Sequence, residues 1–305
     1  MITLNDATLN KVVTPIVEAY SNESYAARKI APVVPVDGSD YAYRVWSADH
    51  LRYVKSVVGE RGKAIPFDVN MSWTEDKTHD HFRELFIPQR ILDKGAKAGI
   101  RYATEEAEML AESMLVEEEY DLASVFTTGS NWTNKATPST KWDTSGATPQ
   151  DDVNTGINAI QAAVGRNPNT MMMTTDVFRV LVSEYVRSLD GWQAQGSKKA
   201  VLEYFGADCL TQLIVCSSLY NSVKKGQTKS LTGIWGSKNL WLGYVNPTPS
   251  RSAPSLASTF ENRGGSFSEG EMQKNPKGQT VYVHRDYDQK VRNETAGYYL
   301  YTCLG

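Results

Sequence analysis

The segment RYATEEAEMLAESMLVEEEYDLAS, Arg101–Ser124, carries the longest helical pattern in the sequence. Thr104 suits the N-cap, because its hydroxyl can accept a hydrogen bond from a free backbone N–H of the first turn. Three glutamates follow in that turn, where they complement the positive end of the helix dipole. Gly129 is typical of a helix end. At 1.5 Å per residue, the predicted helix of about 24 residues, spanning about 105–128, is roughly 36 Å long.

Two separate apolar faces run along this predicted helix. At about 100° per residue, the main stripe consists of Ala107, Leu110, Ala111, Met114, Leu122 and Val125. A second patch consists of Met109, Val116, Tyr120 and Ala123. An acidic ridge lies between them and consists of Glu105, Glu108, Glu112 and Glu119. The two faces predict a helix that touches two different bodies.

Glu118 breaks the main stripe, because it falls in the middle of the apolar residues. A carboxylate on a buried face costs several kcal/mol unless a cation pairs with it. We therefore expect an arginine or lysine partner for Glu118, in the same subunit or across an interface. The alternative is that the helix is exposed at this point.

Residues 1–30, upstream of the helix, are expected to form an arm. They are polar, with two short apolar runs, Val12-Val13 and Ile16-Val17, broken by a proline. Too little of this segment is apolar for it to fold alone, so an ordered arm must lie on another surface. The four apolar residues are the expected contacts.

A long β-hairpin is predicted between the arm and the helix. Asp40–Val45 alternates polar and apolar residues, and the same period of two runs from Phe67 to Trp73. The charged, glycine-bounded segment between them is typical of a turn and consists of Gly59, Glu60, Arg61, Gly62 and Lys63. A hairpin with one modest apolar face is marginal by itself, so we expect it to lie on another surface.

Beyond a polar loop at 130–150, the pattern becomes mixed α/β. The predicted helices are 153–164, 176–189 and 200–205. The predicted strands are 170–173, 210–215, 240–245, 280–287 and 296–304.

Composition excludes several classes of protein. The chain has 305 residues, 41% of them hydrophobic and 22% charged, which is ordinary globular usage and excludes a disordered or coiled-coil chain. A net charge of −3 gives no basic field for wrapping nucleic acid. No apolar run is long enough to span a membrane, and the first residues do not resemble a secretory signal. The three cysteines, Cys209, Cys216 and Cys303, are too few for a disulfide framework. We expect a soluble, intracellular chain of one large or two modest domains.

Catalytic motifs are largely missing. The sequence contains no phosphate-binding loop, dinucleotide-binding glycine motif, nucleophile elbow or zinc-protease motif. His79 and His81, two residues apart, would share one face of a strand and could both reach a cation. The alternative for this hydrophilic segment is a solvated strand face. We expect no catalytic residue, no metal and no cofactor, with a metal-dependent hydrolase using these histidines as an alternative.

Several segments, taken in order, resemble the major capsid proteins of tailed bacteriophages with the Hong Kong 97-type fold. The quoted segment 101–124 is similar to the spine helix of that family. AVGRNPNTMMMTTDVFRVLV, residues 163–182, resembles the start of its axial domain. YFGADCLTQLIVCSSLYN, residues 204–221, and IWGSKNLWLGYV, residues 234–245, resemble its later helix and strands.

The resemblance implies an α+β fold in four parts: an N-terminal arm (1–30), an extended loop (31–80), a peripheral domain with the spine helix (81–152 and 266–294), and an axial domain (153–265 and 295–305). It also implies a structural protein rather than an enzyme. Such subunits form the pentamers and hexamers of an icosahedral virion shell, which is assembled in the host cytoplasm and encloses double-stranded DNA without sequence-specific binding. The implied partners are a portal and separate scaffolding and decoration proteins, with no membrane.

The same resemblance implies which residues contact other subunits. The loop tip, Gly59 to Lys63, would lie on a neighbouring subunit. Some relatives join subunits by a lysine–asparagine bond, for which Lys55, Lys63 and Asn293 are the candidates. An encapsulin-like nanocompartment, which encloses a protein cargo, is the alternative within the same fold.

Overall fold

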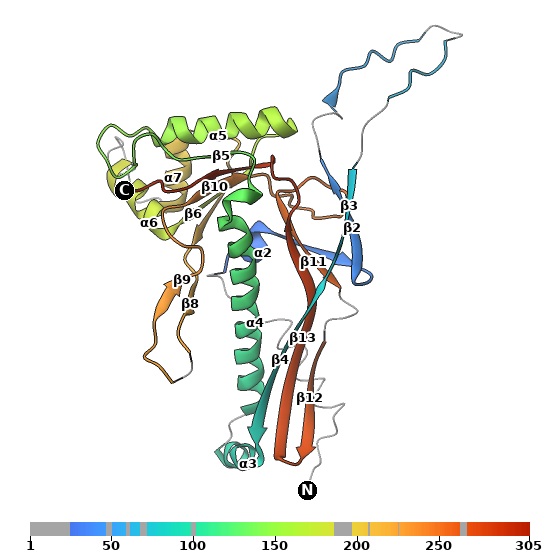
Figure 1. The fold of residues 1–305 in the computed structure, drawn as a ribbon, viewed down its shortest axis with the longest axis vertical. Coiled ribbons are helices and arrows are strands. Elements are labelled where there is room, and N and C mark those ends of the chain that lie inside the picture. The colour runs from blue at the N-terminus through green and yellow to red at the C-terminus, as the bar shows by residue number, and fades with distance from the viewer. Residues whose placement is uncertain are drawn as a thin grey trace.

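The computed structural model describes residues 25–46, 51–58, 62–67, 72–98, 102–185, 197–206, 208–224, 226–262 and 267–305. Two five-stranded sheets pack against the long helix α4 (Tyr102–Thr127), which Figure 1 shows running down the middle of the molecule. α4 confirms the predicted helix to within a few residues at each end. Within the described part of the chain, no helix combines the length and apolarity needed to cross a bilayer.

The first sheet is built around β13, a strand of 15 residues. Its members are β1 (Val33–Val36), β4 (His79–Pro88), β11 (Ala257–Asn262), β12 (Phe267–Lys274) and β13 (Lys277–Val291). β4 pairs antiparallel with one edge of β13, and β12 and β11 pair antiparallel with successive parts of the other edge. β1 adds to β11 in parallel. Segments from both halves of the chain therefore form one sheet.

The second sheet has the strand order β5-β14-β10-β6-β7. Its strands are β5 (Lys135–Ala136), β6 (Thr170–Thr174), β7 (Gln212–Cys216), β10 (Leu240–Gly243) and β14 (Gly297–Leu300). Every residue of the three central strands is buried. In β6, for example, Met171 and Met173 join one hydrophobic core while Met172 joins the other. A strand buried on both faces needs apolar residues throughout, which explains the continuous run of methionines.

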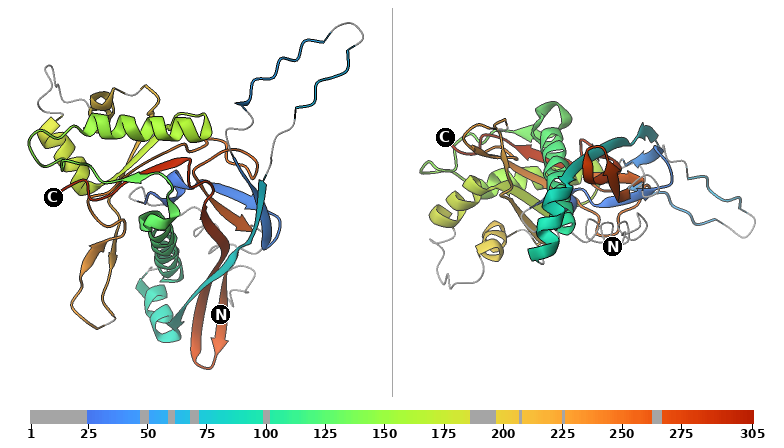
Figure 2. Two further views of the ribbon diagram at one scale, coloured as in Figure 1. Left: turned by 45° about the horizontal axis from the view of Figure 1, so that its top comes forward. Right: turned by 90° about the horizontal axis from the view of Figure 1, so that it is seen from below.

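Three helices and a short π-helix pack on one face of the second sheet (Figures 1 and 2). They are α5 (Pro149–Val164), α6 (Thr175–Val180), η3 (Leu181–Tyr185) and α7 (Ser197–Phe205). The other face holds an aromatic cluster in which Trp241 stacks on Tyr299 at 5.2 Å. The C-terminal turns of α4 enter this cluster, where Trp132 and Trp241 both donate indole hydrogen bonds to the Phe126 carbonyl, at 2.8 and 3.2 Å. A carbonyl near the end of a helix is thereby satisfied.

α4 touches two bodies, as predicted, but the second apolar patch is only partly used. The N-terminal half of its main stripe packs on the first sheet, with Leu110 and Met114 against Val281 and Val283. Toward the C-terminal end, Leu122 of the main stripe and Ala123 and Val116 of the second patch pack in the core beside the second sheet. Both predicted faces therefore contribute to the second contact, whereas Met109 and Tyr120 of the second patch are 53% and 47% exposed.

β2 (Asp40–Val45) and β3 (Ser72–Lys77) form an antiparallel ribbon. The first strand matches the prediction, but the second begins at Ser72 rather than at Phe67, because the polar segment through Lys77 is the part that pairs. Beyond the ribbon, residues 51–58 and 62–67 project away from both sheets in all views (Figures 1 and 2). A second ribbon consists of β8 (Leu219–Asn221) and β9 (Leu231–Gly233).

The structure contains three short helices that the sequence did not predict: α2 (Ala27–Ile30), α3 (Gln89–Ala98) and η2 (Gly129–Asn131). α2 lies within the predicted arm, yet Ala26, Ala27 and Ile30 are buried in the core beside α4. The predicted helix 176–189 is α-helical only to Val180 and continues as a π-helix to Tyr185.

Candidate functional site

Glu118 lies in a buried ion-pair network between α4 and β13. Its carboxylate is 1% exposed, with Oε2 2.5 Å from Arg285 Nη1 and 3.1 Å from Arg28 Nη2. The expected cationic partner therefore exists within the same chain, and the alternative of an exposed position is wrong. Arg285 also contacts Glu261 at 3.1 Å, so this network connects α2, α4, β11 and β13.

Glu119, the next residue, is completely buried, although the helical wheel placed it on the acidic ridge. Its carboxylate accepts hydrogen bonds from the backbone N–H groups of Ala26 and Ala27, at 2.9 and 2.7 Å, and from the Ser218 hydroxyl at 2.8 Å. The indole of Trp235 donates a fourth. These donors come from segments remote in sequence, so the pattern of α4 alone could not reveal them.

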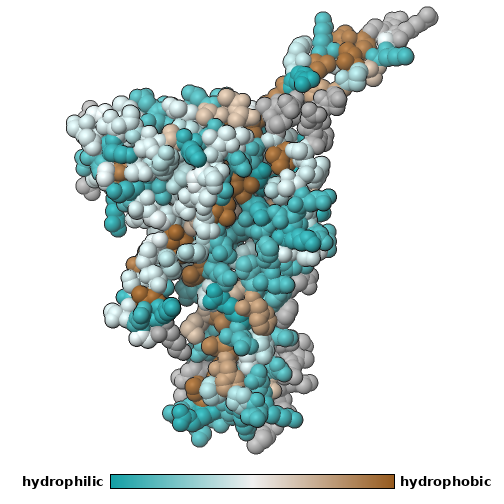
Figure 3. All heavy atoms as spheres, in the orientation of Figure 1, coloured by the Kyte–Doolittle hydropathy of each residue, from teal (hydrophilic) through white to brown (hydrophobic). Residues whose placement is uncertain are grey.

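The projecting loop carries exposed apolar side chains (brown at the upper right of Figure 3). They are Leu51, Tyr53, Val57, Val58, Ile65 and Phe67, which are between 44% and 86% exposed. A contiguous apolar surface of this kind usually marks a contact with another molecule.

Of the predicted tip residues, Gly62 and Lys63 are exposed on this loop, while Gly59, Glu60 and Arg61 lie outside the described residues. The arm residues Val12, Val13, Ile16 and Val17 also lie outside the described part.

The crosslink candidates differ in their surroundings. Lys55 is exposed on the loop, as is Lys63. Asn293 is buried, and its amide nitrogen donates to the Trp46 carbonyl at 2.6 Å. Its oxygen accepts a bond from the Thr295 N–H at 2.9 Å, so the side chain is engaged within the subunit.

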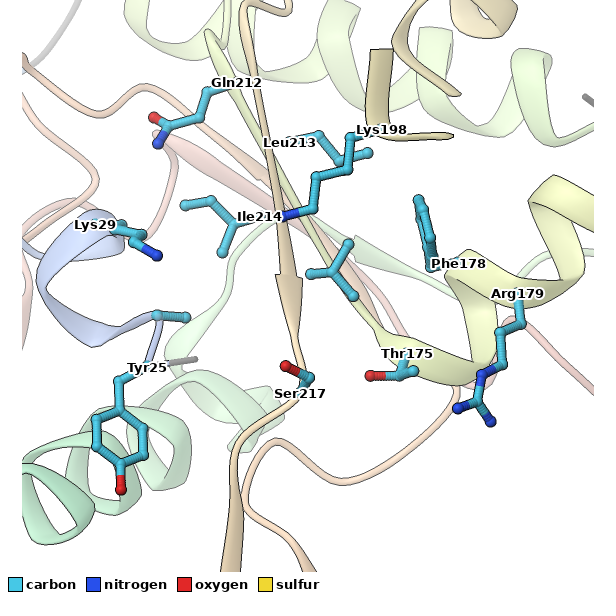
Figure 4. Close-up of a pocket in the computed structure, with 12 residues that line it drawn as sticks. Tyr25, Lys29, Thr175, Phe178, Arg179, Lys198, Gln212, Leu213, Ile214 and Ser217 are labelled. Atoms are coloured by element: carbon cyan, nitrogen blue, oxygen red, sulfur yellow. The ribbon is translucent and has the colours of Figure 1, made fainter. Parts of the chain in front are cut away.

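A pocket of about 570 Å³ lies over β7, the edge strand of the second sheet. In the view of Figure 4, Lys29 lies on one side of the strand, and Phe178 and Arg179 lie on the other. Among the described residues, the lining includes lysine, arginine and hydroxyl groups but no carboxylate, imidazole or thiol. The described lining therefore lacks histidine, the most common general acid–base residue.

The cysteines are free thiols. Cys216 and Cys303 are buried, and burial raises the pKa of Cys303 to about 12, so it stays protonated at neutral pH. Cys209 is only partly buried. Of the two candidate histidines, His79 is exposed, whereas His81 pairs with Glu117 of α4 at 3.2 Å. The structure thus places His81 beside an acid of α4 rather than beside a second histidine of its own strand.

No family model and no curated protein sequence matches this chain. Solved structures do resemble it. A phage-related protein from Bordetella bronchiseptica RB50 has a TM-score of 0.72 at 18% identity, and 97% of each chain is covered. The putative capsid protein of a prophage of Escherichia coli CFT073 has a TM-score of 0.60 at 12% identity, with both chains covered completely. This chain has the fold of phage capsid proteins.

Two assembled particles contain subunits with the same capsid fold. The capsid of Myoviridae phage XM1 matches with a TM-score of 0.53 at 12% identity, covering 93% of this chain and 95% of that one. The virus-like particle from Pyrococcus furiosus matches with a TM-score of 0.52 at 11% identity, covering 96% and 98%. The α+β capsid fold expected from the sequence is therefore confirmed.

Proposed function

We propose that this chain is the major capsid protein of a tailed phage. In this role it is a structural protein rather than an enzyme, and it assembles into the icosahedral shell that encloses double-stranded DNA. The capsid fold over the whole chain supports the proposal, but the observation that carries it is the projecting loop. Its apolar side chains are exposed in the single subunit, so they require a partner surface.

A closed shell supplies that surface from copies of the same chain, because symmetry repeats each contact in every subunit. Each contact can be modest, since many of them act together. In our assignment, the loop lies on a neighbour, α4 and the first sheet form the peripheral domain, and the second sheet forms the axial domain of pentamers and hexamers. The shell is a virion component formed in the host cytoplasm, with a portal and separate scaffolding and decoration proteins as partners.

A nanocompartment with a protein cargo is the competing function within this fold. Two matches favour the phage role, because the phage-related and prophage proteins have TM-scores of 0.72 and 0.60, against 0.52 for the archaeal particle. The contents of purified particles separate the two functions. Nuclease-protected DNA supports the phage shell, and a stoichiometric protein cargo without DNA contradicts it.

The decisive experiment measures native mass by light scattering for the parent chain and for the double variant Tyr53→Ser/Val57→Ser. In the parent, Tyr53 is 86% exposed and Val57 is 78% exposed. We expect megadalton particles from the parent and subunits or small oligomers from the double variant, with an unchanged melting temperature of the subunit. Lys55→Ser is the matched control, because it removes a long exposed side chain from the same loop but leaves the apolar surface. A double variant that assembles like the parent would contradict the interfacial loop. A parent that stays near 33.9 kDa under all assembly conditions, with or without scaffold, would contradict the shell.

A further inference from the structure

Three potential metal ligands meet where α4 packs on β4. His81 comes from β4, and Glu117 and Asp121 come from α4. One ligand atom of each residue lies within 4.8 Å of the other two. The two acids are four residues apart, so they share one face of the helix, and that face is turned toward the strand. Neither the strand nor the helix supplies this set alone.

The arrangement leaves one oxygen of Glu117 facing the imidazole. Arg83 donates two hydrogen bonds to Oε2, at 2.7 and 3.1 Å, which fixes the plane of the carboxylate. The other oxygen, Oε1, lies 3.2 Å from His81 Nδ1. Hydrogen bonds from an outer residue to a ligating carboxylate are a regular feature of metal sites, because they orient the ligand.

Asp121 has too little positive charge around it. Among the described residues it forms no ion pair, since Arg83 and His81 both pair with Glu117. The carboxylates of Glu117 and Asp121 therefore lie close together with their nearest cations directed at Glu117 alone. A bound cation between the two carboxylates would offset their mutual repulsion.

Tyr287 lies against two of the three proposed ligands. Its ring stacks on His81 with a centroid distance of 4.0 Å, and its side chain lies close enough to Asp121 to influence that carboxyl. The residue is 1% exposed, and the group its hydroxyl reaches is the Asp121 carboxyl, although without the geometry of a well-formed hydrogen bond. A buried hydroxyl with so poor a contact is stabilised by a further polar group beside it. A water bound to a metal at this position would be such a group.

We propose that His81, Glu117 and Asp121 bind one divalent transition-metal ion, with Zn²⁺ as the best fit. One imidazole and two carboxylates suit Zn²⁺, which commonly takes three protein ligands and a water. Mg²⁺ and Ca²⁺ prefer oxygen ligands only, so the imidazole disfavours them. His81 and Glu117 have side chains that are 18% and 31% exposed, which leaves the ion a route from solvent.

The ion would fasten α4 to the edge strand of the first sheet. Because the ligands come from two elements that separate on unfolding, the metal binds the folded chain in preference to the unfolded one. The site is therefore structural, and it stands apart from the shell function proposed above.

The test is calorimetric titration of the chelator-treated full-length chain with Zn²⁺, together with thermal melting at increasing Zn²⁺. We expect one Zn²⁺ per chain and a rise in melting temperature, with no comparable effect of Mg²⁺. His81→Gln and Asp121→Asn should each weaken binding at least about tenfold. His79→Gln is the matched control, because His79 is an exposed histidine on the same strand and should leave binding unchanged.

The variant Asp121→Asn also distinguishes the loss of a metal ligand from a failure to fold. It removes the repulsion between the two acids, so without metal it should melt no lower than the parent, while the Zn²⁺-dependent rise is lost. The proposal is overturned if the parent binds no Zn²⁺, if Asp121→Asn binds it as tightly as the parent, or if His79→Gln loses binding to the same extent as His81→Gln.

Discussion

Arg285 of β13 and Glu118 of α4 form a buried ion pair, with Nη1 2.5 Å from Oε2. Arg28 completes the pairing from α2 at 3.1 Å, so three segments far apart in sequence meet at one carboxylate. A buried ion pair is weak support for net stability, since desolvation offsets its attraction, but the loss of one partner leaves an uncompensated charge. We therefore expect the pair to matter more for how α4 is positioned on the sheet than for net stability.

Glu118→Gln should lower the free energy of unfolding by about 3 kcal/mol, the lower end of the range for breaking a buried pair. We expect the lower end because Glu261 still pairs with Arg285. Urea unfolding of the subunit measures the change. Glu112→Gln, on the partly exposed side of the same helix, should have little effect. If both variants lost the same free energy of unfolding, the buried ion pair would contribute no more to stability than a partly exposed glutamate.

Stability should fall in acid because of the same carboxylate. Burial by itself raises the pKa of Glu118, but the charges of Arg285 and Arg28 outweigh it and hold the pKa below its ordinary value of 4.5. A lowered pKa in the folded state means that the ionised group stabilises the fold at neutral pH, and that this contribution is lost as the pH falls below about 4.5. Unfolding curves between pH 7 and pH 3 should be less pH-dependent in Glu118→Gln than in the parent. Parallel pH profiles would contradict the assignment.

Glu119→Gln should loosen residues 25–30 from α4. The amide keeps one acceptor oxygen where the carboxylate has two, and its NH₂ group would face the N–H donors of Ala26 and Ala27. Leaving buried donors unsatisfied costs about 1–3 kcal/mol. Hydrogen exchange at these two amides should speed up markedly. Trp235→Phe removes a single donor to the same carboxylate, so it should have a smaller effect on exchange.

Gly165→Ala should shift Leu51 at the base of the projecting loop. Gly165 ends α5 with a φ of 68°, and a Cβ there would lie 2.0 Å from Leu51 Cδ1. Gly206 is the matched control, because it has a φ of 59° but open space around it. Gly206→Ala should cost about 1 kcal/mol from backbone strain alone. Gly165→Ala adds a contact with the end of the Leu51 side chain, which is 55% exposed and can move at little cost, so the two variants should melt alike. Gly165→Ala alone should impair assembly, because it displaces a residue of the projecting loop. Equal assembly of the two variants would contradict this.

Deletion of residues 1–24 should leave a folded subunit that assembles poorly, since the arm's apolar residues are expected to contact neighbours. Deletion of residues 1–30 should instead destabilise the subunit itself. It removes Arg28 from Glu118 and the backbone donors from Glu119. Thermal melting and light scattering separate the two effects. Normal assembly of the shorter deletion would contradict a role for the arm in subunit contacts.

The sequence by itself determined the local elements. The apolar period of α4, the glycine at the end of α5, and the buried methionine strand β6 all depend on neighbours within a few residues. Local propensity and burial period are therefore sufficient to predict them. The predicted N-cap was wrong, because α4 begins at Tyr102 and Thr104 lies within its first turn. The partner of Glu118 was predictable as a type of residue, because a buried charge requires one, but its position on β13 was not.

Tertiary structure alone decided which distant groups meet. The helical wheel placed Glu119 on the acidic ridge, yet it is buried, because α2 and Trp235 cover a side of α4 that its own sequence marks as polar. His81 was paired in expectation with His79 on its own strand, whereas the fold places it against two acids of α4. Strand pairing and helix docking bring together residues that no local periodicity connects, and the desolvation of polar groups at those contacts then determines their chemistry.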